Sequence, residues 1–294
     1  MRCLLPIVLL ACTLTASGQG IFFGNGSSGS GNPYTELANI DDITTQGSPG
    51  WSLCDAGCAG GGDQAPTSWV QTFGVTTQSK DGHSMSLAMI AQAQGSGTNA
   101  LETYKIGHNP TADTLTHFVS DQWFYGDTNW GTYALQTEFD DALFCSTCTD
   151  GGAFPNGINY MFGFQCDLTR SGGVIEVWNQ ATGTWVTATY SGGNIPCTTS
   201  GFAAPNTWHH LQKTEHLVSG DYSSCSGAYP TMHYDNITLD GVPYTPTNTN
   251  TCAGPLHAGW NSVWLTQMQF NIGSSGSSGN TATVYYDLTN FFYY

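Results

Sequence analysis

A strand-like stretch, residues 132–144, carries two carboxylates on one of its faces. Because successive residues of a strand point to opposite sides, Glu138 and Asp140 share a face with Gln136. The opposite face is mostly apolar and could pack on a core: Tyr133, Leu135, Thr137 and Phe139. Only 9% of the chain is charged. The pair is therefore a candidate for acid/base chemistry, for holding a sugar or for holding a loop.

A second carboxylate, Glu176, lies in the strand-like segment 174–178. If this segment runs near Glu138, the two glutamates could face each other across a groove. In a partly apolar cleft the pKa of one would rise, and the two would form an acid/base pair. The alternative is that Glu176 is a surface residue beside Trp178. We predict Glu138, Asp140 and Glu176 as the catalytic candidates.

The aromatic content is high, with nine Trp and 14 Tyr residues. Aromatic planes can stack on sugar rings, but they also fill the cores of β proteins. Trp130 and Trp178 are the best surface candidates. The predicted ligand-binding residues are Trp123, Tyr125, Trp130, Gln136, Gln165 and Trp178.

The histidines give no metal motif by spacing. His209 and His210 are adjacent, so their side chains diverge in a strand, and the others considered are too scattered in the sequence. No cofactor is required by any motif. A structural calcium ion is possible, because acidic exported β-sandwiches often hold one through carboxylate oxygens, here Asp287 with Asp41 or Asp42.

Two of the ten cysteines, Cys3 and Cys12, lie in the N-terminal segment. The other eight predict up to four disulfides in an exported chain. The proposed pairs are Cys54–Cys58, Cys145–Cys148, Cys166–Cys197 and Cys225–Cys252. The alternative is a zinc site built from the two close pairs, but no pair of histidines lies near them.

Residues 1–18 resemble a secretory signal peptide, with a basic start, an apolar run and a small-residue cleavage site. Secretion is the prediction, and lipid anchoring through Cys12 is the alternative. Residues 19–33 are rich in Gly and Ser and predict a flexible leader. No segment has the roughly 18 consecutive apolar residues that a membrane span needs.

The charge balance excludes some classes of partner. Removing Arg2 from the five basic residues leaves four against 21 acidic ones, a net charge of −17. Nucleic acid and anionic membranes are unfavourable partners for such a chain, because they require clustered Lys and Arg. Neutral oligo- or polysaccharides remain open. The sequence does not predict the oligomeric state.

From residue 68 onward, short alternating segments follow one another with turn residues between them, and no helical period is sustained. The pattern predicts an all-β fold, an antiparallel two-sheet sandwich of the jelly-roll kind. No shift in composition marks a boundary, so residues 34–294 are predicted to form a single domain.

Five strand signatures follow in order: Met161 to Cys166, Val174 to Trp178, Trp208 to His210, Ile237 to Gly241 and Val284 to Asp287. Together they resemble the concanavalin A-like lectin and glucanase superfamily, in particular its laminin-G-like secreted bacterial members. The resemblance implies that a Trp-His strand precedes a strand ending in Asp-Gly, and that the last strand returns to the middle of a sheet. It supports the fold more than any function.

Members of that superfamily that cleave β-glucans carry Glu-x-Asp-x-x-Glu, or a version one residue shorter, on one strand. Glu138 and Asp140 match the first half, but the third carboxylate position falls on Ala142 or Leu143. The leading hypothesis is therefore a lectin-like protein that binds a neutral glycan on the concave sheet. The alternatives are a glycan-cleaving enzyme that uses Glu138 with Glu176, and a structural or adhesive extracellular protein.

Overall fold

The computed structural model describes fifteen parts of the chain, and the described residues in all of them belong to one compact unit, Pro33–Tyr294. The described residues are 35–40, 51–54, 70–75, 78, 80, 85–92, 95–108, 117–132, 134–145, 157–180, 182–218, 231–248, 250–255, 264–276 and 281–293. For β1 to β5 and β19 we describe only the backbone. No described segment is a helix, so none of these residues forms a helix long and apolar enough to cross a membrane.

The first sheet, here called sheet 1, has the strand order β16-β15-β14-β6-β20-β4-β3, with β1 beside β20 and β17 beside β15. In this order its strands are Val242–Tyr244, Thr231–Leu239, Trp208–Val218, His117–Gly126, Thr281–Tyr293, Met85–Gln92 and Val70–Val75, with Thr35–Ile40 and Asn250–Cys252 alongside. The last strand, β20, lies between β6 and β4, in the interior of the sheet.

The second sheet, sheet 2, has the order β11-β10-β9-β7-β19-β5-β2, with β8 pairing β7 and β18 pairing β8. These strands are Thr184–Thr187, Val174–Asn179, Phe164–Asp167, Ala134–Cys145, Trp264–Gly276, Gly95–His108 and Trp51–Cys54, with Ile158–Phe162 and Gly254–Pro255 alongside. A short hairpin, β12 (Thr189–Tyr190) with β13 (Gly193–Asn194), completes the described strands.

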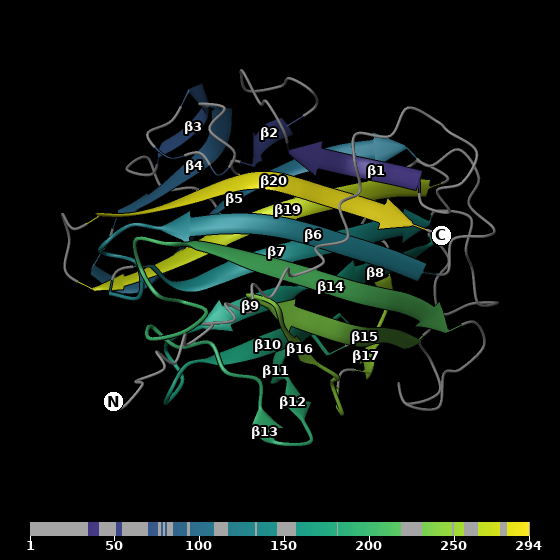
Figure 1. The fold of residues 1–294 in the computed structure, drawn as a ribbon. Coiled ribbons are helices and arrows are strands. Elements are labelled where there is room, and N and C mark those ends of the chain that lie inside the picture. Colours follow the sequence, from purple (N-terminus) through teal and green to yellow (C-terminus); the bar gives the residue numbers. More distant parts are fainter. Residues whose placement is uncertain are drawn as a thin grey trace, which may run out of the picture. The chain divides into compact units, whose positions relative to one another are not determined.

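All the pairings between these strands are antiparallel, and the chain passes repeatedly from one sheet to the other. Figure 1 shows β20, β6 and β14 of sheet 1 crossing in front of β19 and β7 of sheet 2. The predicted all-β, antiparallel two-sheet sandwich is confirmed. The expected positions of the last strand and of the Trp-His strand β14 beside β15 are confirmed as well.

Aromatic side chains from both sheets form the layer between them. The ring of Phe139 in β7 lies 4.7 Å from Phe124 of β6 and 5.6 Å from Tyr286 of β20. All three rings are fully buried. Thr137 and Asp141, on the same face of β7 as Phe139, are buried too. Strand β7 therefore turns its odd-numbered face toward sheet 1 and its even-numbered face away from it.

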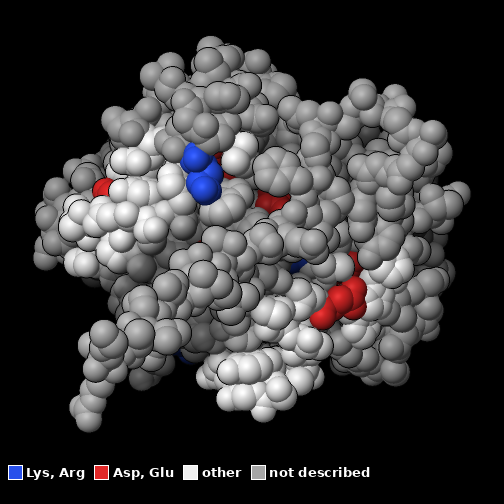
Figure 2. Space-filling view, viewed as in Figure 1, with Lys and Arg blue, Asp and Glu red and all other residues white. Residues whose placement is uncertain are grey.

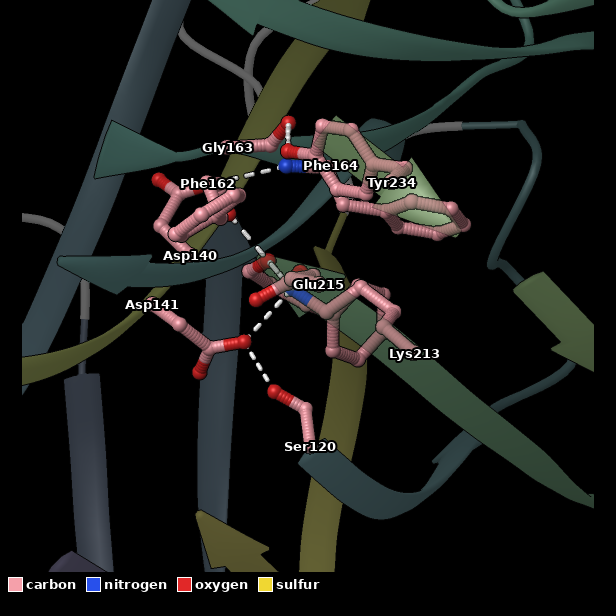
Figure 3. A network of polar contacts seen from close by, with 10 residues as sticks. Ser120, Asp140, Asp141, Phe162, Gly163, Phe164, Lys213, Glu215 and Tyr234 are labelled. Carbon is pink, nitrogen blue, oxygen red and sulfur yellow. Dashed lines mark hydrogen bonds and ion pairs between the residues drawn. The ribbon is translucent and has the colours of Figure 1, made fainter. Parts of the chain in front are cut away.

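A polar cluster is enclosed in the same layer, and Figure 3 shows it around the buried ammonium group of Lys213. Lys213 Nζ lies 2.6 Å from Asp141 and 3.2 Å from Glu215, and it donates to the carbonyl oxygens of Phe139 and Phe162. Ser120 Oγ donates to Asp141. On the face of the molecule seen in Figure 2, the described charges form only small, separate patches.

One predicted disulfide, Cys166–Cys197, is observed, and it ties β9 to the segment that follows β13. Cys252 is also disulfide-bonded, but its predicted partner Cys225 lies outside the described residues. The side chains of Cys54, Cys58, Cys145 and Cys148 lie outside them as well.

Candidate functional site

Polar side chains lie in a row across four neighbouring strands of sheet 2. Glu138 of β7 is opposite Gln165 of β9, Gln165 is opposite Glu176 of β10, and Glu176 is opposite Thr187 of β11. Directly opposed residues of antiparallel strands point to the same face of a sheet. We call Glu138, Gln165, Glu176 and Thr187 the acidic row. It lies on the face of sheet 2 that is turned away from sheet 1.

Glu176 is the most heavily bonded member of the row. Its Oε2 accepts a 2.6 Å hydrogen bond from Gln165 Nε2, and its Oε1 accepts a longer one, 3.4 Å, from Thr187 Oγ1. Arg170 Nη2 lies 3.3 Å from the same Oε1 atom. Although Glu176 is on an outer face, it is only 1% exposed. The structure places Glu138 and Glu176 on the same face of sheet 2, with Gln165 of β9 between them.

The side-chain carbonyl oxygen of Gln165 is buried and has no hydrogen-bond partner. Because Nε2 of the same amide is turned to Glu176, Oε1 is directed away from Glu176. A buried acceptor without a donor costs about 1–3 kcal/mol of stability. A molecule that brought a hydroxyl or N–H group to Oε1 would remove this cost.

One exposed cation lies against the row. Arg170 is 59% exposed and pairs with Asp167 at 3.4 Å as well as with Glu176. Asp167 also accepts from the backbone N–H and the hydroxyl of Thr169, so a tight turn after β9 holds it in place. Two buried carboxylates therefore share one guanidinium group, which leaves the area with excess negative charge.

Asp140 holds the backbone at a strand break, which agrees with the loop-holding role that the sequence left open. Its side chain is 1% exposed, and Oδ1 accepts a 3.1 Å hydrogen bond from the backbone N–H of Phe164. This bond lies where the pairing of β7 changes from β9 to β8, at Gly163. A Cβ atom on Gly163 would lie 2.6 Å from Cβ of Trp178. Asp140 and Gly163 therefore fix the break between the two strands.

The negative charges on this face also affect the core. Burial raises the pKa of the Tyr286 phenol well above its ordinary value, and Glu138 and then Asp140 raise it further. Tyr286 consequently remains a neutral phenol at any pH at which the protein would be handled. The two carboxylates of β7 are thus close enough to the layer between the sheets to change the pKa of a buried side chain there.

Two tryptophans continue the same face beyond the row. Trp178 of β10 is opposite Trp185 of β11, and their rings lie 5.2 Å apart at 62°. Both are partly exposed. Trp178 follows Glu176 by two residues, so it extends from the same side of the strand. Gln136 lies on that side as well, two residues before Glu138 and opposite Asp167.

The other predicted ligand-binding aromatics do not join the row. Trp130, predicted as a surface residue, is buried in the core, where its Nε1 donates to Thr137 Oγ1 at 2.9 Å. That prediction is wrong, because the turn before β7 folds the indole inward against Phe124. Trp123 and Tyr125 lie in β6 of sheet 1, on a face directed away from the acidic row.

Of the three residues predicted to bind calcium, Asp41 and Asp42 lie outside the described residues. Asp287 is buried, and its two oxygens accept the backbone N–H groups of Lys80 and Leu288. These bonds occupy the carboxylate at a bulge in β20. Among the described side chains, no three carboxylates, histidines or cysteines are grouped as metal ligands.

Three residues around the row were not predicted: Asp167, Arg170 and Thr187. Local sequence gave one usable signal, since Asp167 and Thr169 form an Asx-type turn that places Arg170 beside the strand end. Thr187 had no signal at all. It joins the row only because β11 pairs with β10 in this register.

No family model matches the sequence, and no curated protein matches it. Solved structures with a similar fold include an endo-β-1,4-glucuronan lyase from Trichoderma reesei (13% identity, TM-score 0.46, covering 87% of this chain and 95% of the lyase). They also include a carbohydrate esterase of bacteriophage phi24B (15%, 0.45, 88% and 99%) and an endo-1,3-β-glucanase from Streptomyces sioyaensis (11%, 0.43, 92% and 99%). These values do not place the chain in a family.

Proposed function

We propose that the outer face of sheet 2 binds a neutral carbohydrate at the acidic row. The observation that carries the proposal is the buried, unpartnered Oε1 of Gln165 between Glu138 and Glu176. A sugar hydroxyl is a suitable donor for this oxygen, and a second hydroxyl could donate to Glu138. Hydroxyl groups also accept, so Arg170 could contribute hydrogen bonds from the same side.

The charge of the area supports a neutral ligand rather than an anionic one. Glu138, Asp167 and Glu176 outnumber the single guanidinium group of Arg170. An anionic glycan would meet repulsion, whereas a hydroxyl-rich neutral glycan would form charge-assisted hydrogen bonds to carboxylates. The partly exposed Trp178 and Trp185 offer an apolar surface on which a further sugar ring could stack.

Glycan cleavage by Glu138 and Glu176 is the second candidate, and the strand spacing constrains it. One strand, β9, separates the two residues, so their backbones lie about 10 Å apart. Retaining hydrolysis requires carboxyl groups roughly 5–5.5 Å apart, whereas inverting hydrolysis uses about 6.5–9.5 Å. If the row cleaves a glycosidic bond, inversion is the expected stereochemistry, with a water molecule between the carboxyl groups.

A glycan array followed by detection of reducing ends tests both candidates. Binding without products supports the carbohydrate-binding protein, and products support the enzyme. If neither binding nor products are detected, a structural or adhesive extracellular protein is the remaining candidate.

Gln165→Leu should abolish binding, because it removes the amide while keeping a similar volume. Asp121→Asn, on the outer face of sheet 1, is the matched control and should bind normally. Equal binding by wild type and Gln165→Leu would refute the proposed site.

A further inference from the structure

A buried lysine lies between the two sheets with two carboxyl groups beside it. Lys213 of β14, in sheet 1, places Nζ 2.6 Å from Asp141 Oδ2 of β7, in sheet 2, and 3.2 Å from Glu215 Oε1 of its own strand. Figure 3 shows the three side chains converging. All three are 0% exposed. Strands of different sheets therefore hold an amine and a carboxyl group in direct contact, away from water.

The distance between Lys213 and Asp141 suits the formation of a bond. Because a C–O bond is about 1.23 Å long, an Nζ atom in this contact with Oδ2 lies roughly 3.3 Å from Asp141 Cγ at an ordinary hydrogen-bond angle. Reacting atoms held about 3–3.5 Å apart reach effective concentrations of about 10⁵–10⁸ M. Nζ also donates to the carbonyl oxygens of Phe139 and Phe162, and these bonds fix its position.

The cluster also contains an acid that can relay protons. Burial raises the pKa of Glu215 well above its ordinary value despite the opposing charge of Lys213, so Glu215 is a carboxylic acid beside the ion pair of Lys213 and Asp141. Within the described part of the chain, Asp141 Oδ1 and Glu215 Oε2 are buried without a hydrogen-bond partner. The acid thus has a proton to donate, and the carboxylate has an oxygen that can accept one.

We infer that Lys213 and Asp141 react with each other after folding and form an amide cross-link between the two sheets. Nζ attacks Asp141 Cγ to form the N–C bond, and one carboxyl oxygen of Asp141 leaves as water. Of the three protons on the ammonium group, one stays on the amide nitrogen and two leave with the water. Glu215 is the catalytic residue, because it contacts Nζ, relays these protons and ends with the proton that it held at the start.

The surroundings of the pair favour the amide. Two full charges in a dry interior carry a desolvation cost that their attraction offsets only in part, whereas an amide is neutral. The ring of Phe164 lies 5.8 Å from Nζ, and the buried rings of Phe162 and Tyr234 lie 5.6 Å from each other in the same layer. An apolar layer of this kind keeps out the water that would hydrolyse the product.

The cross-link forms slowly and fastens the middle of the sandwich. The folded chain first holds the charged pair, in which the ammonium group is no nucleophile, so a proton must pass from Nζ to Asp141 before the attack. The joined strands are interior ones, since β14 lies between β15 and β6 and β7 lies between β9 and β19. The disulfide Cys166–Cys197 ties β9 to the segment after β13 and does not join the two sheets. Unlike a disulfide, the amide resists reducing agents.

The test is mass spectrometry of the folded, purified chain after reduction and alkylation of its cysteines. We expect an intact mass that is lower than the sequence mass by one water molecule. Trypsin cleaves after Lys and Arg, so an unlinked chain would give residues 106–170, 171–213 and 214–294 as separate peptides. The linked chain should give 106–170 joined to 171–294, uncut after Lys213. The full sequence mass, with cleavage after Lys213, in protein kept folded for days would overturn the proposal.

Variants of the cluster test the role of each group. Lys213→Arg keeps a cation but has no primary amine, so it should retain the full sequence mass. Glu215→Gln keeps both reacting groups, and its rate of water loss after refolding should fall at least ~100-fold. Lys80→Arg is the matched control, because Lys80 lies over the ring of Trp123, on a different residue from the cluster, and it should lose water like the wild type.

Circular dichroism checks that each variant folds. If Glu215→Gln does not fold, Asp141→Asn replaces it, and it should give the same joined peptides with loss of ammonia in place of water. A linked Lys213→Arg would overturn the assignment of the bond. Undiminished linking in folded Glu215→Gln would overturn the catalytic role of Glu215.

Discussion

Two acidic regions lie on opposite faces of the same strand, and they use their carboxylates differently. Asp141 of β7 points into the layer between the sheets, where Lys213 is paired with it and with Glu215. Glu138, three residues earlier, points outward into the acidic row, where the exposed Arg170 pairs with Glu176. The inner cluster encloses its cation completely, whereas the cation of the outer row is 59% exposed.

The difference indicates what each region is for. Burial alone would lower the pKa of Lys213, but Asp141 and Glu215 outweigh it and raise that pKa above its ordinary value. The ammonium group therefore stays charged, and it also binds two backbone carbonyls from β7 and β8. The inner cluster ties the two sheets together. Both regions contain buried acceptor atoms without a hydrogen-bond partner, Gln165 Oε1 in the row and Asp141 Oδ1 and Glu215 Oε2 in the cluster. They differ in the cation, which is exposed to solvent only in the outer row.

Loss of the buried cation should have the largest effect on stability. Lys213→Met leaves Asp141 charged and unpaired between the sheets, and we expect it to lower the free energy of unfolding by about 3–5 kcal/mol. Denaturation in urea measures this change. The double variant Lys213→Met/Asp141→Asn removes both charges and should recover part of the loss. A single variant as stable as the wild type would show that the cluster does not hold the sheets together.

A methyl group at Gly163 should have the next largest effect. Gly163→Ala places a carbon 2.6 Å from Cβ of Trp178, at the break between β8 and β9. Overpacking of this kind costs about 1–3 kcal/mol. Gly201→Ala is the comparison variant, because its nearest contact is the hydroxyl of Thr198 at 3.0 Å, which can rotate away. Thermal unfolding of the two variants should differ, and equal melting temperatures would contradict the tight approach at Trp178.

The pH dependence of stability should come from the inner cluster. Burial raises the pKa of Glu215 well above its ordinary value, and Asp141 raises it further, although Lys213 acts in the opposite direction. The folded state therefore holds a proton that the unfolded chain releases above about pH 4.3. In that window the unfolded state binds fewer protons, so stability falls as pH rises, by up to about 1.4 kcal/mol per pH unit.

Glu215→Gln should remove this contribution. The variant should lose less stability than the wild type between about pH 4.5 and pH 7, because its amide cannot ionise. Urea denaturation at several pH values compares the two slopes. Parallel slopes would mean that Glu215 titrates normally in the folded protein.

Substitution in the outer row should have the smallest effect on stability. Glu138→Gln changes a partly exposed side chain, and we expect a change in the free energy of unfolding within about 0.5 kcal/mol. The same variant should weaken glycan binding at least ~10-fold, because it removes a charged acceptor. Stability and binding measured on one preparation test the comparison directly. A large loss of stability with unchanged binding would reverse the roles assigned to the two regions.

Local sequence was sufficient for much of the fold and for part of the site. The period of two in β7 predicted which residues face inward and which face outward, and the outward position of Glu138 and Gln136 is as expected. The pairing of Cys166 with Cys197 was also predicted. The divergence of His209 and His210 is confirmed, since His209 is buried among Phe124 and Phe202 while His210 is partly exposed.

Local sequence failed where burial depends on distant segments. Trp130 seemed suited to a surface, but the turn around it inserts the ring between core aromatics. Holding a loop was one of the roles predicted for Asp140, but its partner, the backbone N–H of Phe164 at the break between β8 and β9, could not be identified from the sequence. The adjacency of His117, His216 and His233 was not expected, because it depends on the pairing of β6, β14 and β15.

The sequence alone determined the all-β class, the inward and outward faces of β7 and the chemical types available on each face. These follow from alternation along one strand, which is a local property of the chain. The tertiary structure decided which residues of different strands are opposite one another. Register is fixed by long-range packing of the two sheets, and it assembles the acidic row. The residues of the acidic row are not contiguous in the sequence, and for that reason they could not be seen there as a unit.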